Sequence, residues 1–428
     1  MLIQFNFKNY KSFREEVSLD MSATKVSEHQ THVIDIAKDK LLKVAAIYGA
    51  NAAGKSNVYD AFEYMTYYVL NSFKFGGDND TKQKEDKLYN KVTPFLFNKI
   101  SKNEPTTFEV FFIDSEDAAC RSYQYGFSVN ADEVLEEWLF SKSKTAKEYK
   151  TIFYRKKGEP VDYVGIKKGA ENIDISLEKE TLIVSLGAKL KITKLKMVRD
   201  WFMKNEVVDF GDPAENFLRS RMLPHNFADD KIVQKNVVNY FASFDEAIKE
   251  FNVEKDISGN ESNDKINVKI DSLHKMSDSD ELVSLSFSDE SSGTLKMFAL
   301  YPPIQDVLEN GSTLFVDELN ARLHPLLVRN IILTFVNPEI NRKNAQLVFT
   351  THDIWQLSND LLRRDEIWFV EKDNDGVSDL YSLADFVDEE GTKIRKDEVY
   401  AKNYLLGRYG AIPKLKSLDM LKGEKPSK

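Results

Sequence analysis

The alternation of apolar and polar residues predicts a strand, a loop and a helix in the first 75 residues. Near the N-terminus, the stretch LIQFNFKNY places Ile3, Phe5 and Phe7 on one side, which is the period-two pattern of a half-buried strand. Residues 41–49 form a short apolar run typical of a buried strand, and residues 55–73 carry apolar side chains at helical spacing. A glycine-bearing loop lies between these last two segments.

The middle of the chain mixes strand and helix patterns. Short alternating runs predict a meander of paired strands, and apolar residues at helical spacing predict helices farther on. The predicted elements are strands at 106–115 and 120–130, helices at 194–205 and 237–251, and loops at 75–87 and 255–265. No long heptad repeat occurs, so no coiled-coil arm is expected.

Composition narrows the class of protein. With 42% hydrophobic and 30% charged residues among 428, the chain is expected to be a soluble globular protein of two or three domains. The single cysteine, Cys120, excludes an intramolecular disulfide and fits a reducing cytosol. No apolar stretch approaches the ~18 residues that span a bilayer, and the N-terminus lacks a signal-peptide pattern. We therefore expect a cytoplasmic location and no membrane partner.

The net charge of −10 limits contact with nucleic acid to a local patch. One basic run could form such a patch, although a solvated hairpin tip is the better explanation for it. The run consists of Lys142, Lys144, Lys147, Lys150, Arg155, Lys156 and Lys157.

Residues 49–56, GANAAGKS, fit the phosphate-binding pattern G-x-x-x-x-G-K-[ST]. Backbone N–H groups of such a loop, and of the helix after it, point at phosphate oxygens. Lys55 is expected at the β- and γ-phosphates and Ser56 at Mg²⁺. The candidate nucleotide-binding residues here are Gly49, Ala50, Asn51, Ala52, Ala53, Gly54, Lys55, Ser56 and Asn57.

A second motif lies at 312–320, STLFVDELN, where an apolar strand ends in Asp317 and Glu318. Sheets of α/β proteins place ligands at this end of their strands. Asp317 can order the Mg²⁺ shell, and Glu318 can polarise the attacking water as a general base.

The stretch SDESSGTLKMFAL, residues 288–300, places Ser291 and Gly293 at the start of a predicted helix. A serine and a glycine at a helix N-terminus can receive an anion, although a simple helix cap has the same pattern. In this order with the two other motifs, it resembles the signature of ABC-class ATPases, the branch that includes SMC proteins and RecF. The second signature position is Ser292 here, where transporters carry glycine.

Further segments resemble this branch. FNFKNYKSF (5–13) is similar to its opening strand, which implies contacts of Lys11 and Ser12 with the nucleotide. His352 in VFTTHD stands where the family keeps a switch histidine at the γ-phosphate. The resemblance thus implies catalytic roles for Glu318, His352 and Lys55, with ATP and Mg²⁺ as cofactors. Gln124 is a candidate Q-loop residue only by its strand-end position.

The segment DELNARLHPLL (317–327) is similar to the Walker B motif and D-loop of OLD-like and abortive-infection ATPases, although Asn320 stands where many relatives carry Asp. The ending YLLGRYGAIP (404–413) is similar to that of AbiL/RloA-type phage-defence ATPases. The resemblance implies a homodimer or higher even oligomer in which each site joins one P-loop to the other subunit's signature. It also implies a nuclease or toxin effector encoded nearby.

Two other functions stay open at this point. A RecF- or SMC-like DNA-repair ATPase is the main alternative, and a transporter motor is disfavoured by the inserted segment and the Leu-His-Pro loop. The predicted fold is an α/β P-loop ABC-type ATPase head with an inserted strand-and-helix lid. Residues 1–75 and 281–428 would form the head, and residues 76–280 the lid or middle lobe.

Overall fold

The computed structural model describes most of the chain. The described residues are 1–36, 38–75, 91–114, 117, 119–166, 168–219, 221–242, 247–258, 265–387, 394–395 and 398–413. Within them, we find no helix with the length and apolar character that a bilayer-spanning segment needs.

A six-stranded sheet carries the glycine loop. Its order is β10-β14-β15-β5-β16-β17, in which only the edge strand β17 runs antiparallel to its neighbour. The strands are β5 (Val44–Gly49), β10 (Glu206–Asp209), β14 (Thr313–Asp317), β15 (Gln346–Thr350), β16 (Ile367–Lys372) and β17 (Ser378–Ser382). Because β5, β14 and β15 are parallel, the loops that follow them meet at one edge of the sheet.

A second six-stranded sheet is antiparallel, with the order β2-β1-β6-β7-β8-β9. Its strands are β1 (Leu2–Lys8), β2 (Val17–Asp20), β6 (Thr106–Ile113), β7 (Ser122–Val129), β8 (Val134–Lys142) and β9 (Lys150–Lys156). A separate pair consists of β3 (Val33–Ile36) and β4 (Asp39–Leu42).

Helix α1 (Lys55–Asn71) lies between the two large sheets. Its Phe62 shows this directly, because the ring contacts Phe5 of β1 at 5.3 Å and Phe315 of β14 at 5.4 Å between centroids. The helices α4 (Ile183–Lys189) and α5 (Thr193–Lys204) extend the same hydrophobic core. The helix that follows the glycine loop is therefore held by apolar contacts on both sides.

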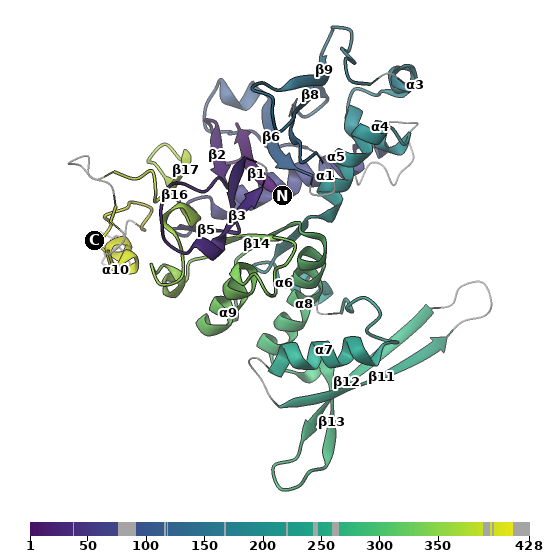
Figure 1. The fold of residues 1–428 in the computed structure, drawn as a ribbon, viewed down its shortest axis with the longest axis vertical. Helices are drawn as coiled ribbons and strands as arrows, with labels where there is room; N and C mark the ends of the chain where they lie inside the picture. Colours follow the sequence, from purple (N-terminus) through teal and green to yellow (C-terminus); the bar gives the residue numbers. More distant parts are fainter. Residues whose placement is uncertain are drawn as a thin grey trace, which may run out of the picture.

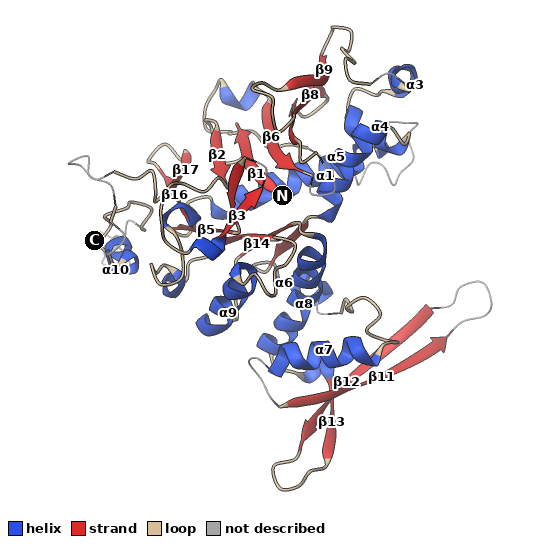
Figure 2. Ribbon diagram, viewed as in Figure 1, coloured by secondary structure: helices blue, strands red, loops and turns tan. Residues whose placement is uncertain are grey.

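The opposite face of the parallel sheet packs against a second core. Four of the described helices contribute to it: α7 (Lys231–Ala242), α8 (Ser292–Asn310), α9 (Pro325–Val336) and α10 (Tyr400–Leu405). Figure 2 shows α8 and α9 together beside β14. Since both faces are covered, every residue of β5 and β14 is buried, and most of these residues are apolar, as in most parallel strands.

A three-stranded antiparallel sheet, which we call the arm (residues 248–286), projects from the rest of the molecule (Figure 1). Its strands are β11 (Ile248–Ser258), β12 (Lys265–Lys275) and β13 (Leu282–Ser286). Helix α7 (Lys231–Ala242) packs against β11. The remaining helices are α3 (Ala170–Ser176) and α6 (Pro213–Arg219), with 3₁₀ turns at Gln30–His32, Ser72–Lys74, Ser101–Asn103, Phe287–Asp289, Ile354–Gln356 and Arg364–Glu366.

Most predicted elements are confirmed, and one is wrong in its second half. The paired strands at 106–115 and 120–130 are β6 and β7, and the helix at 194–205 is α5. The helix predicted at 237–251 ends at Ala242, and Ile248 begins β11. The apolar residues of this short stretch fit the spacing of a helix and of a strand alike. Pairing with β12 makes it a strand.

The two predicted loops fall largely outside the described residues. Of 75–87, only Phe75 is described, and of 255–265 the ends belong to β11 and β12.

The range 76–280, predicted as one inserted lid, supplies elements to three sheets. Strands β6 to β9 continue the sheet of β1, β10 forms the edge of the parallel sheet, and β11 and β12 form most of the arm. The boundaries of the three predicted domains stay a prediction.

Candidate nucleotide-binding site

The glycine loop connects the end of β5 to the start of α1, as predicted. Gly54, just before α1, has φ 118°, a conformation that side chains with a Cβ rarely adopt. A Cβ at this position would lie 2.7 Å from Ser378 Oγ and 2.8 Å from Ser12 Oγ. Both backbone conformation and space therefore require glycine where the loop turns into the helix.

Lys55 lies across this loop. Its side chain is only 5% exposed, and Nζ donates hydrogen bonds to the carbonyl oxygens of Gly49 at 3.0 Å and Ala50 at 3.3 Å. Burial lowers the pKa of Lys55, and the carboxylates of Glu318 and Asp317 oppose that shift. A phosphate chain in the loop would give this ammonium group stronger, charged acceptors than the two carbonyls.

Ser12 supports the loop from the side. Its Oγ accepts a hydrogen bond from Asn57 Nδ2 at 2.7 Å and lies 2.7 Å from Ser378 Oγ. Ser378 Oγ is also 2.5 Å from the carbonyl oxygen of Ala53. Lys11 instead forms an ion pair with Asp60 of α1, so its predicted contact with the nucleotide stays a prediction. Ser378 was missed because nothing near it in the sequence marks its contact with the loop.

Asp317 and Ser56 lie together, as a magnesium site requires. Asp317 is 3% exposed, and its carboxylate accepts hydrogen bonds from the hydroxyls of Thr350 and Ser56. Burial raises the pKa of Asp317 to about 6. A buried carboxylate beside a serine hydroxyl is the kind of oxygen donor set that binds Mg²⁺ together with phosphate oxygens. The residues present therefore fit Mg²⁺. Thr350 is a further hydrogen-bond partner of Asp317 that the sequence did not indicate.

Glu318 and His352 contact each other directly. Glu318 Oε2 lies 3.0 Å from His352 Nδ1, and the Glu318 backbone has φ 53°, in the left-handed region. His352 Nε2 lies 3.2 Å from Asn320 Nδ2, which can only donate. In the neutral ring the proton therefore belongs to Nδ1, facing Glu318. Asn320, the departure from the usual D-loop aspartate, also accepts a hydrogen bond from Thr351 Oγ1 at 2.7 Å.

Ser291 caps the N-terminus of α8. Its Oγ accepts a hydrogen bond from the Thr294 N–H at 3.1 Å. At Gly293 an added Cβ would meet nothing closer than 3.7 Å, so the backbone there is open to an approaching group. Across the described ranges, no hydrogen bond or ion pair joins Ser291 or Gly293 to residues 49–57.

Lys296 connects α8 to the turn that carries Glu318, a contact the sequence did not reveal. Its Nζ donates hydrogen bonds to the carbonyl oxygens of Leu319 at 3.2 Å and of Ala321, and it lies 4.3 Å from the centre of the Phe210 ring. Burial lowers the pKa of Lys296 to about 7. This lysine holds the backbone just after the candidate general base.

A cavity of about 400 Å³ adjoins the glycine loop. It is bounded by residues 50–53, residues 370–374 and the ending 411–413. The ending is fixed there because Tyr381 Oη donates a hydrogen bond to the Tyr409 carbonyl oxygen at 2.6 Å. The C-terminal segment that resembles defence ATPases therefore lies beside the loop.

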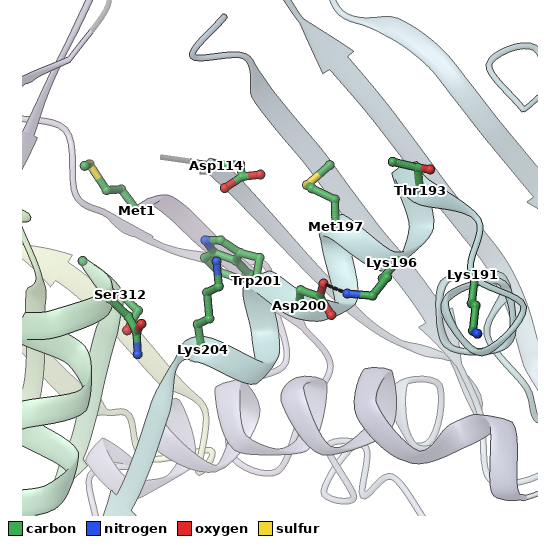
Figure 3. A pocket seen from close by; sticks show the side chains of 12 residues that line it. Met1, Asp114, Lys191, Thr193, Lys196, Met197, Asp200, Trp201, Lys204 and Ser312 are labelled. Atoms are coloured by element: carbon green, nitrogen blue, oxygen red, sulfur yellow. Dashed lines mark hydrogen bonds and ion pairs between the residues drawn. The ribbon is translucent and has the colours of Figure 1, made fainter. Parts of the chain in front are cut away.

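Another cavity, of about 260 Å³, lies among α5, the N-terminus and the start of β14 (Figure 3). Trp201, Lys204 and Ser312 line it, and Lys196 pairs with Asp200 at its side. It shares no lining residue with the glycine loop. Since Ser312 precedes β14 and Asp317 ends it, this cavity lies at the opposite end of that strand from the magnesium site.

The basic run does not form one continuous patch. Arg155 is buried and donates a hydrogen bond to the Thr181 carbonyl oxygen at 2.7 Å. Lys157 pairs with Glu133 at 2.5 Å.

Gln124, the candidate Q-loop residue, lies in the antiparallel sheet. Its side chain donates a hydrogen bond to Glu109 at 2.7 Å, and no described hydrogen bond links it to the glycine loop.

The glycine loop, the buried Asp317 and the Glu318–His352 pair at one edge of a mainly parallel sheet define an α/β P-loop ATPase head. Residues 44–354 match the family "AAA domain, putative AbiEii toxin, Type IV TA system", and the chain belongs to this family.

The fold is also similar to solved head domains of Smc proteins. One is the SmcHead bound to the C-winged helix domain of ScpA, at 14% identity and a TM-score of 0.41, covering 92% of this chain and 99% of that one. A second, from Pyrococcus yayanosii with a coiled coil and joint, has 12% identity and a TM-score of 0.41, covering 91% and 98%. A third, from Pyrococcus furiosus, has 15% identity and a TM-score of 0.39, covering 89% and 96%. Comparison with curated proteins gives no match.

Proposed function

We propose that this protein is an ATP-binding and ATP-hydrolysing switch that acts by closing two heads around the nucleotide. The observation that carries the proposal is the convergence of Lys55, Ser56, Asp317 and Glu318 at the ends of β5 and β14. Lys55 would bind the phosphates, and Ser56 and Asp317 would hold Mg²⁺, which supplies charge neutralisation at the phosphates when bound.

Glu318 would accept the proton of the attacking water. Its carboxylate is held at His352 Nδ1, so the histidine fixes the base before ATP arrives. When a γ-phosphate enters, the same histidine can turn to it, and the base is then released toward the water. This pair gives the switch a residue that senses whether the γ-phosphate is present.

The signature residues would complete the site of a second subunit. Ser291 and Gly293 lie at the start of α8, make no described hydrogen bond to the subunit's own loop, and offer a helix N-terminus to an anion. A head-to-tail homodimer with two-fold symmetry would bring each signature to the partner's γ-phosphate and form two equivalent sites.

The first test replaces Glu318 with Gln. This change removes the general base and keeps the shape, so we expect ATP binding to persist while turnover falls by at least about 10². Because ATP then stays bound, the closed dimer should accumulate. ATP hydrolysis and the molar mass in solution with ATP and Mg²⁺ measure both effects. Wild-type turnover in this variant would reject Glu318 as the base.

We further propose that the switch serves anti-phage defence of the abortive-infection type and controls a separate effector. The family description names AbiEii and a type IV toxin–antitoxin system, and the ending 404–413 resembles that of AbiL/RloA-type ATPases. In the described part of the chain, no group of three or more His, Cys, Asp or Glu side chains could hold a metal as a nuclease centre would. We place the toxic chemistry in another protein, a nuclease or toxin.

A further inference from the structure

The residue just before the signature is held by the arm. The Glu290 carboxylate lies 2.6 Å from His274 Nε2 and accepts a hydrogen bond from the Ser272 hydroxyl. Both partners belong to β12. The Glu290 side chain is 7% exposed, His274 is 21% exposed and Ser272 is fully buried, so the carboxylate itself is largely shielded from solvent.

An aromatic contact fixes the same junction from a second direction. Phe287, three residues before Glu290, lies 4.6 Å from Phe298 of α8 and 5.9 Å from Phe251 of β11 between ring centroids. The start of α8 therefore has little freedom to move without the base of the arm. Ser291 follows Glu290 directly, so the orientation of the arm sets the position of its hydroxyl and of the α8 N-terminus.

We propose that His274 and Ser272 are positioning residues for the signature, and that the arm controls the ATP site of the partner subunit. This inference rests on the proposed head-to-tail dimer. It assigns the arm an effect in trans, because in the proposed dimer Ser291 serves the loop of the partner subunit. A protein that binds the arm and moves β12 would change ATP retention through the Glu290 contacts.

The test uses full-length heterodimers with two different tags, in which both subunits carry Glu318→Gln so that bound ATP is retained. One subunit also carries Lys55→Ala, which disables the site built on its own loop. The remaining site then uses the loop of the other subunit and the signature of the Lys55→Ala subunit. His274→Leu, which removes the contact to Glu290, is placed in either subunit, and retained radiolabelled ATP is measured per dimer.

We expect His274→Leu to lower ATP retention about tenfold when it is in the Lys55→Ala subunit, as the loss of one charge-assisted hydrogen bond predicts. In the opposite subunit it should have no effect, because it then damages only the site that is already disabled. His274→Gln, which keeps a donor for Glu290, should restore retention.

A matched control is Asp271→Asn, in the same strand. Asp271 accepts hydrogen bonds from Ser284 Oγ at 3.0 Å and Lys269 Nζ at 3.3 Å and has no hydrogen bond to Glu290. Its substitution should leave ATP retention unchanged in either subunit.

Equal loss in both arrangements would show a general structural defect, and loss only in the opposite subunit would show an effect in cis. Either result overturns the proposed role of His274. If the dimer with Lys55→Ala alone neither forms nor retains ATP, the composite site itself fails, so the two failures are distinguishable.

Discussion

At the scale of single residues, the nucleotide motifs could be predicted because each is local in sequence. Gly54, Lys55 and Ser56 are neighbours, and Asp317 and Glu318 follow one strand. Their partners could not be predicted in the same way. Thr350, Ser378 and Lys296 reach the site from other strands and helices, and only the pairing of those elements brings them there. One sequence taken by itself offers no signal for such contacts.

Lys296 gives the first prediction at this scale. Replacing it with Met keeps much of the side chain but leaves the carbonyl oxygens of Leu319 and Ala321 without their donor. We expect a loss of about 1–3 kcal/mol in the free energy of unfolding and a fall in turnover, with ATP binding retained, because the turn at Glu318 loses its support. Urea denaturation and ATPase assays measure these effects. Lys343→Met, at an exposed position, should change neither.

The same lysine predicts a dependence of stability on pH. Burial lowers the pKa of Lys296 to about 7, below the value of about 10.4 for a lysine in the unfolded chain. Between these values the unfolded state binds more protons, so the contribution of Lys296 to the free energy of unfolding rises with pH and is lost as pH falls through about 7. The stability difference between wild type and Lys296→Met should therefore grow from pH 7 to pH 9. A constant difference would contradict the lowered pKa.

At the scale of elements, the sequence predicted segments better than their pairing. The pattern of 106–130 indicates two paired strands, but nothing in it shows that β6 also pairs with β1, about one hundred residues earlier. The short strand β10 was missed because four residues carry too little periodicity, yet its Asp209 pairs in register with Asp317. Where apolar residues fit both periods, as near Phe251, long-range pairing decides the structure.

Glu137 shows how one carboxylate joins two elements. From β8 it accepts hydrogen bonds from the N–H groups of Ile183 at 2.6 Å and Val184 at 3.0 Å, in the first turn of α4, and from Tyr125 Oη at 3.0 Å. Burial raises the pKa of Glu137 to about 7, above the value of about 4.3 in an unfolded chain. Its contribution to stability is therefore complete below pH 4 and is lost as pH rises through about 7.

We expect Glu137→Gln to remove this pH dependence. At pH 5 the wild-type carboxyl is protonated and resembles the amide, whereas at pH 8 it is a buried charge. Stability relative to wild type should therefore shift in favour of the variant from pH 5 to pH 8, measured as urea midpoints at both values. Glu136→Gln, the half-buried neighbour in the same strand, serves as the control and should show no such shift. A difference that stays constant with pH would contradict the raised pKa.

At the scale of the whole molecule, the fold combines a candidate nucleotide site, a helix N-terminus that carries the proposed signature, and a projecting arm. The sequence could indicate the first two because each has a motif, but the arm has none. Its strands are ordinary in composition, and its closeness to the signature depends on β13 leading directly into the turn before α8.

The last prediction concerns the proposed effector. We expect a neighbouring gene to encode a nuclease or toxin that this protein binds and keeps inactive until infection. Cells that carry both genes should limit phage growth. Lys55→Ala should abolish protection while both proteins still accumulate, because it removes the ammonium group that binds phosphate. Phage plating and a pull-down of the neighbour test this, with Lys343→Met as a variant that keeps protection. Protection by this chain alone, or a neighbour that does not bind, would reject the two-component function, and sensitivity to DNA damage without phage would instead favour a RecF-like repair role.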